Sequence, residues 1–80
     1  MLKIEVKTKL SPEEIIKKAV EFFSTGCGLK VKHQAFAYVS FEGGGGGVEV
    51  TVYTKEKGTS VELVSQEWDL QVKEFIRKIS

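Results

Sequence analysis

The sequence predicts a two-layer α+β fold, in which two amphipathic helices cover one face of an antiparallel sheet of four or five strands. Three observations support this prediction. Several short segments alternate apolar and polar residues at period two, as half-buried strands do. Two other segments repeat apolar residues at helical spacing, which gives each helix one apolar face. Turns rich in glycine separate consecutive strand segments. We therefore expect one domain over residues 1–80, with the order β-α-β-β-(β)-β-α.

The N-terminal part of the chain predicts one strand followed by one helix. Residues 2–7 alternate between aliphatic and charged side chains, which is typical of a strand with one face in water. Ser11 is well suited to cap a helix, Pro12 to occupy its first position and Glu14 to complete a capping box. We expect this helix to end at Gly26, in a left-handed cap.

The longest alternating segment, residues 29–41, exceeds the usual length of one strand. It therefore predicts either one strand with a bend or bulge near residues 33–35, or two strands. We expect its odd-numbered positions to face the helices, which places His33, Ala35 and Ala37 among apolar neighbours.

Five consecutive glycines, Gly43–Gly47, lie between two strand-like segments. A phosphate-binding P-loop would need a following Lys and a helix, so the run instead predicts a mobile hairpin loop whose role stays open. Residues 48–53 and 61–64 resume the alternation across a short turn, which completes an antiparallel meander. Ser65 is the expected cap of the second helix, whose apolar stripe runs through residues 68–79.

The order of these elements resembles half of the fold of the TATA-box-binding protein, and also small ligand-binding domains in which helices lie over a sheet. The resemblance concerns the order of elements, and no motif of either family is matched residue by residue. It therefore implies a fold and carries over no functional residue.

The sheet face opposite the helices is the candidate interaction surface. The even-numbered positions of residues 29–41 and their neighbours place charged side chains there, together with aromatic and aliphatic ones. Contiguous apolar side chains on an uncovered face often mark association. Reversing the register of residues 36–41 would instead expose Ala37, Val39 and Phe41. The candidate surface comprises Lys30, Lys32, Phe36, Tyr38, Tyr53 and Val64.

The reactive side chains are too few for several kinds of site. Cys27 is the only cysteine and His33 the only histidine, so an internal disulfide and the usual zinc ligand sets are excluded. Cys27 follows a helix C-terminus, where the helix dipole disfavours a thiolate. These two side chains could meet across the turn, but no third group is evident to orient them. We therefore expect no enzyme, no cofactor and no metal.

The charge pattern gives little reason to expect nucleic acid as a partner. The net charge is +1, and Arg77 is the only arginine. The chain lacks a run of about 18 apolar residues, so we expect no membrane span. The first residues alternate and do not form a signal-peptide core, and we expect a cytoplasmic protein.

Three functional hypotheses follow. The leading one is a non-catalytic binding or assembly module that forms a homodimer through the outer sheet face or an edge strand, since a chain this short has only about 3–5 kcal/mol of stability. The first alternative is a binder of small apolar ligands, with a pocket between the sheet and the C-terminal helix near Ala35, Ala37 and Trp68. The second alternative binds single-stranded nucleic acid on the outer face, through lysine charge and aromatic stacking.

Overall fold

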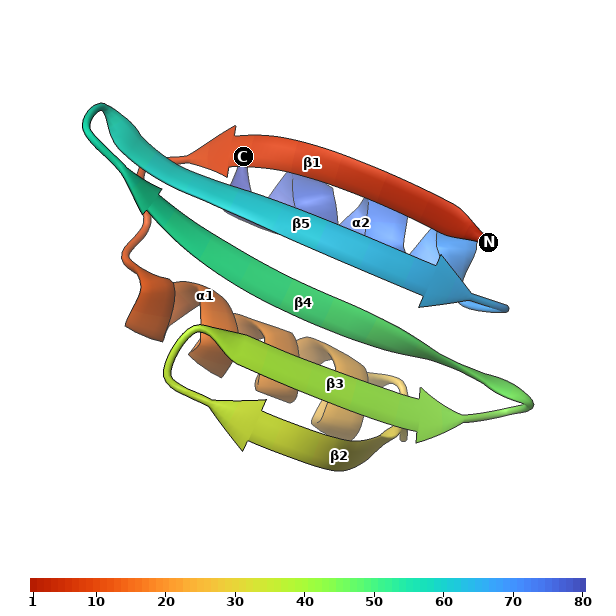
Figure 1. Cartoon of the computed structure of the whole chain (residues 1–80). Helices are drawn as coiled ribbons and strands as arrows, with labels where there is room; N and C mark the ends of the chain where they lie inside the picture. The colour runs from red at the N-terminus through yellow and green to blue at the C-terminus, as the bar shows by residue number, and fades with distance from the viewer.

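A computed structural model describes all of residues 1–80. It contains one five-stranded antiparallel sheet in the order β1-β5-β4-β3-β2, and both helices lie behind the same face (Figure 1). The predicted α+β class and element order, with the fifth strand, are confirmed. The elements are β1 (Leu2–Thr8), α1 (Pro12–Ala19), the π-helical segment η1 (Val20–Gly26), β2 (Lys30–Ala35), β3 (Tyr38–Gly43), β4 (Gly46–Lys55), β5 (Gly58–Gln66) and α2 (Asp69–Ile79).

Helix α1 begins as the sequence predicts. The Ser11 side-chain oxygen accepts a hydrogen bond from the Glu14 backbone N–H at 3.3 Å, and the Ser11 N–H donates to the Glu14 carboxylate at 3.3 Å. These two bonds form the capping box, which satisfies amide groups that have no partner within the helix. Ile15, Ile16 and Ala19 then lie in the core.

The first helix widens into η1 and ends at Gly26, as the sequence predicts, but Gly26 does not form the expected left-handed cap. In a π-helix the backbone amide donates to the carbonyl five residues earlier, so each turn holds an extra residue. Two consecutive rings, Phe22 and Phe23, thereby lie 5.7 and 5.2 Å from the ring of Phe75. The left-handed conformation occurs at Gly28, where φ is 78°.

Residues 29–41 form two strands, and they also contain a bulge. Lys32 has no partner residue on β3, so the register of the β2–β3 pair shifts at this position. Beyond the bulge, His33 pairs with Ser40, and Ala35 lies two positions further along the same outer face. The expectation that His33 and Ala35 face the helices is therefore wrong, because one extra residue moves the following side chains to the opposite face.

The glycine run forms the predicted hairpin, but only two of its residues make the turn. Gly44 and Gly45 join β3 to β4 with φ values of 56° and 82°, as a two-residue turn with positive φ at both positions requires. The indole N–H of Trp68 donates to the Gly43 carbonyl at 2.9 Å, and its ring lies against Gly44. The connection is thus shorter than the expected five-residue loop and is held by a side chain.

Ser65 does not cap helix α2. It belongs to β5, where it pairs with Leu2 of β1 and Val48 of β4. Strand β5 is paired on both sides at Ser65 and on one side at Gln66, and a residue with positive φ, Glu67, then leads into α2. The predicted cap is wrong because strand pairing at both edges overrides a local capping signal.

The core lies between the helices and the inner face of the sheet. Helix α1 packs over β3 and β4, while α2 packs over β1 and β5 (Figure 1). Fifteen buried apolar side chains form one cluster between the layers. Phe23 and Phe75 are fully buried with ring centroids 5.2 Å apart, so they join the two helical halves. Neither helix is long and apolar enough to cross a membrane.

Candidate functional site

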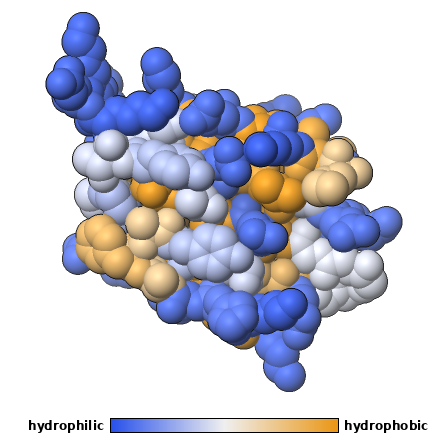
Figure 2. Space-filling view, in the orientation of Figure 1, coloured by the Kyte–Doolittle hydropathy of each residue, from blue (hydrophilic) through white to orange (hydrophobic).

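The sheet face that the helices leave uncovered is chemically mixed. Figure 2 views this face in the orientation of Figure 1, and its hydrophobic areas are separated by hydrophilic side chains. The strand register explains the mixture, because Val64 of β5 lies between Lys3 of β1 and Glu49 of β4. The face therefore carries several small apolar areas and no single continuous one.

Three of the six predicted surface residues lie around one hollow in this face. Tyr38 and Val64 are half-buried there, and Lys32 is exposed at the bulge. Lys30 lies nearer the start of β2, and Tyr53, 45% exposed, lies further along β4. Neither of these two lines the hollow.

Phe36 does not lie on the outer face. Strand β2 ends at Ala35, so Phe36 is part of the turn between β2 and β3, where the strand alternation stops. Its side chain is 68% exposed and lines a groove beside α1 and η1, together with Ile16 and Val20. The sequence predicts Phe36 on the outer face because it occupies an even-numbered position in the alternation of residues 29–41.

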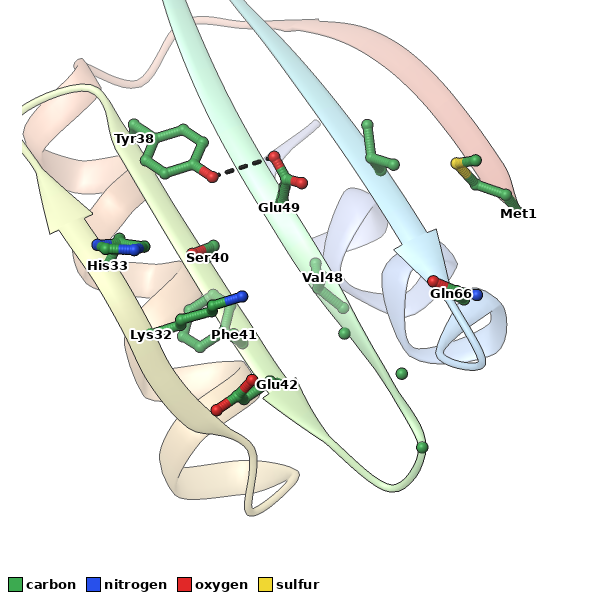
Figure 3. Close-up of a pocket in the computed structure, with 14 residues that line it drawn as sticks. Met1, Lys32, His33, Tyr38, Ser40, Phe41, Glu42, Val48, Glu49 and Gln66 are labelled. Atoms are coloured by element: carbon green, nitrogen blue, oxygen red, sulfur yellow. Dashed lines mark hydrogen bonds between the residues drawn. The ribbon is translucent and has the colours of Figure 1, made fainter.

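The hollow has a volume of about 450 Å³ and lies over β3, β4 and the end of β5 (Figure 3). Gly46 and Gly47 leave space in its floor because they carry no side chains. Close backbone packing requires both glycines. A Cβ at Gly46 would collide with the carbonyl oxygen of Gln66, and one at Gly47 would collide with that of Phe41.

Three of the polar side chains that line the hollow form a row across the strands (Figure 3). His33, Ser40 and Glu49 occupy paired positions on β2, β3 and β4. The Tyr38 hydroxyl donates to the Glu49 carboxylate at 3.0 Å, while Ser40 Oγ is buried without a hydrogen-bond partner. Serine activation needs a histidine between the serine and the carboxylate. Here Ser40 occupies the middle position, so the row lacks that arrangement.

Sequence reasoning missed this row because of the bulge. Simple alternation along β3 and β4 already places Ser40 and Glu49 on the outer face. His33 joins them only because Lys32 is an extra residue in β2. The length of residues 29–41 indicated an irregularity, but it did not show which residue is the extra one.

Cys27 and His33 lie on opposite sides of the sheet. Cys27 packs against the core on the helix side, where burial and, to a lesser extent, the Glu74 carboxylate raise the pKa of its thiol. His33 is exposed on the outer side. A raised pKa leaves less of the nucleophilic thiolate. No three His, Cys, Asp or Glu side chains are grouped closely enough to hold a metal ion.

The residues expected to line an apolar pocket do not come together. Ala35 ends β2 and Ala37 lies in the turn between β2 and β3, whereas Trp68 precedes α2 and contacts Gly44 at the other end of β3. None of the five principal hollows is lined by Trp68.

The sheet has two unpaired edges, β1 and β2. Strand β1 is regular over seven residues, whereas the bulge interrupts β2. The half-buried side chains of β1 on the helix side are Leu2, Ile4 and Val6. Its exposed side chains on the outer side are Lys3, Glu5 and Lys7.

Two polar contacts fix the outer side chains of β1 against β5. Lys3 Nζ lies 3.8 Å from the Glu62 carboxylate. The Ser60 hydroxyl donates to the Glu5 carboxylate at 2.7 Å. This hydrogen bond, followed by the charge of Lys55, lowers the pKa of Glu5. Glu5 therefore carries a negative charge between two lysines on the free edge.

Comparison with known proteins supports the fold alone. No family model and no curated protein matches this chain. The crystal structure of the protein SSP2350 from Staphylococcus saprophyticus is similar, with a TM-score of 0.57 and 14% sequence identity. The match covers 92% of this chain and 76% of that one. At this identity the likeness shows a shared α+β architecture.

Proposed function

We propose that this domain is a non-catalytic assembly module that forms a two-fold homodimer through the edge strand β1. The observation that carries the proposal is the charge order along this regular edge, Lys3, Glu5 and Lys7. An unpaired edge presents free backbone N–H and C=O groups to a further strand. Because positive and negative side chains alternate, the edge is complementary to an antiparallel copy of itself.

The charges favour one register for the pair. When two antiparallel copies are centred on Ile4, Lys3 of each protomer lies opposite Glu5 of the other, and the half-buried aliphatic side chains meet on the helix side. A pair centred on Glu5 would place Lys3 opposite Lys7 and Glu5 opposite its own copy. Like charges directly opposite each other are destabilising, so we expect the register centred on Ile4.

The other candidate surfaces have less support. The bulge at Lys32 and the exposed lysines of β2 are features that protect a natural sheet edge from pairing. The outer face offers only separate apolar areas, and the Tyr38 hydroxyl already binds Glu49. Phe36 lies off that face, which weakens both face-to-face dimerisation and base stacking.

The non-catalytic part of the proposal rests on the separation of Cys27 from His33 and on the position of Ser40 between His33 and Glu49. A cytoplasmic location belongs to the same proposal, because a lone thiol is compatible with a reducing compartment.

Charge exchange on β1 tests the dimer. Lys3→Glu makes positions 3 and 5 acidic in both protomers, and Glu5→Lys makes both positions basic. Each change turns two attractive pairs into repulsive ones, and each exposed pair contributes about 0.2–1 kcal/mol, so we expect the dimer Kd to rise about tenfold or more. An equimolar mixture of the two variants should form heterodimers. Native mass spectrometry and sedimentation would measure both effects.

Two controls separate pairing through β1 from general charge effects. The double variant Lys3→Glu/Glu5→Lys restores complementarity and should dimerise like the wild type. Lys30→Glu makes the same charge change on β2 and should leave the Kd unaltered. A wild-type protein that stays monomeric at high micromolar concentration would refute the proposal, as would equal effects of Lys30→Glu and Lys3→Glu.

A further inference from the structure

Five lysines surround a second hollow, at the end of the molecule where β1, the β4–β5 turn and the C-terminus of α2 meet. Its volume is about 680 Å³. The other residues that line it are Thr8, Leu10, Ile79 and Ser80, so no acidic side chain contributes. The lysines that line it are Lys7, Lys9, Lys18, Lys57 and Lys78. A chain with a net charge of only +1 thus gathers five of its twelve basic residues at one place.

None of the five lysines forms an ion pair within the protein, although the charge of Lys7 contributes to lowering the pKa of Glu5. The ion pair present in the structure joins Lys3 to Glu62 and involves none of the five lysines. Glu14 and Glu74 lie one helical turn from Lys18 and Lys78, and neither makes an ion pair with them. Like charges brought together without ion-pair partners create a local positive potential, which attracts an anion.

One hydrogen bond reduces the repulsion that the C-terminal end of α2 would exert on an anion. Carbonyl groups at a helix C-terminus carry partial negative charge and would repel such a ligand. The Thr8 hydroxyl donates a hydrogen bond to the Ile79 carbonyl near the end of α2. Because Ile79 also lines the hollow, this bond occupies one of the carbonyl groups near it.

The side chains indicate which anion fits. Lysine ammonium groups act as separate point charges, suited to phosphate oxygens but not to bidentate recognition. No aromatic ring lines the hollow, so it offers no surface on which a base could stack. Five positively charged lysines around one hollow are complementary to a linear ligand that carries several negative charges. We infer that this hollow binds a linear chain of phosphate groups, either free or as the tail of a nucleotide.

This inference goes beyond the proposed dimer and does not depend on it. Of the five lysines, only Lys7 belongs to β1, and it has no charged partner in the register centred on Ile4. A monomeric protein could therefore still bind phosphate chains, and a dimer could fail to bind them.

Titration of ¹⁵N-labelled protein with sodium tripolyphosphate, without divalent cations, would test the inference by NMR. We expect shifts confined to the residues that line the hollow, and an affinity that falls as salt is added. Orthophosphate should bind at least about tenfold more weakly, since it meets fewer ammonium groups. Equal binding of ATP and tripolyphosphate would identify the phosphate chain alone as the ligand, and tighter binding of ATP would identify a nucleotide.

A matched pair of double variants tests the location. Lys18→Gln/Lys57→Gln removes two charges from the hollow and should weaken tripolyphosphate binding by about tenfold. Lys30→Gln/Lys73→Gln removes two charges from exposed positions elsewhere and should change it by less than about twofold. Lys78 is left unchanged because its ammonium group lies 5.9 Å from the Phe22 ring centroid.

Three results would overturn the inference. They are equal losses in the two double variants, shifts spread over all lysine-bearing surfaces, and AMP binding as tightly as tripolyphosphate. The first two would indicate general attraction of anions to lysine, and the third would indicate recognition of the base or sugar.

Discussion

Ser60 is nearly completely buried, and its hydroxyl donates the hydrogen bond that most strongly lowers the pKa of Glu5. A carboxylate whose pKa is lowered on folding stabilises the folded state above its unfolded pKa, and this contribution is lost as the pH falls through the folded pKa. We predict that Ser60→Ala raises the pKa of Glu5 toward its ordinary value. The difference in stability between wild type and variant should be present at neutral pH and disappear in strong acid. Carbon-detected NMR titration of Glu5 would measure the pKa.

Ser40→Ala is the matched control for this prediction. Ser40 is also a buried serine on the outer side of the sheet, but its hydroxyl has no hydrogen-bond partner. Removing an unpaired buried hydroxyl should leave the stability unchanged or raise it slightly, and the pKa of Glu5 should not move. If both variants shifted the pKa of Glu5 equally, the Ser60 hydrogen bond would not be the cause.

At the residue scale, sequence reasoning succeeded where the signal is local. The capping box of Ser11 and Glu14 involves residues three positions apart, and both of its hydrogen bonds form. The face of His33 depends instead on a bulge, which the pairing of β2 with β3 decides. No local pattern distinguishes Lys32 from its neighbours as the extra residue, so the row of His33, Ser40 and Glu49 could not be predicted.

The β3–β4 hairpin allows a prediction at the scale of one element. Gly44 and Gly45 both have positive φ, but a Cβ at Gly44 would lie 2.9 Å from Cζ2 of Trp68, whereas Gly45 faces open space. We predict that Gly44→Ala destabilises the protein by about 1–3 kcal/mol, from backbone strain and displacement of Trp68. Gly45→Asn should change the stability by less than about 1 kcal/mol, because Asn tolerates this conformation. Urea denaturation followed by Trp68 fluorescence would compare them, and equal losses would contradict the separate roles.

The elements themselves were largely predictable, but some of their ends were not. Five glycines between two alternating segments predict a hairpin, and the hairpin is present. The contact of Trp68 with this turn joins residues far apart in the chain, so the local sequence could not reveal it. Ser65 shows the same limit, because pairing with Leu2 and Val48 keeps it in β5.

At the scale of the whole molecule, alternation predicts which face a side chain occupies but not which strands are neighbours. The order β1-β5-β4-β3-β2 leaves β1 at one edge, and this placement makes Lys3 and Glu5 candidates for pairing. The lysine hollow depends on the same assembly, because Lys9, Lys18 and Lys57 are distant in the sequence. Neither site could be inferred before the strand order was known.

The proposed pairing through β1 has a consequence for the stability of the whole domain. A partner that binds only the folded state stabilises it, by about 2.7 kcal/mol at a hundred times the Kd. In a domain of this size each kcal/mol raises the Tm by roughly 4–8 °C. We therefore predict that the Tm of the wild type rises by about 10 °C or more as its concentration increases to a hundred times the dimer Kd. Differential scanning calorimetry over a concentration series would measure the rise.

The variant Lys3→Glu separates this effect from aggregation or instrumental drift. Lys3 is exposed, so its replacement should leave the fold of the monomer intact while weakening the pair. The Tm of this variant should stay nearly constant over the concentration range in which that of the wild type rises. A slope equal to that of the wild type would mean that the concentration dependence has another origin, and the small core of this chain would then be sufficient for its stability without a partner strand.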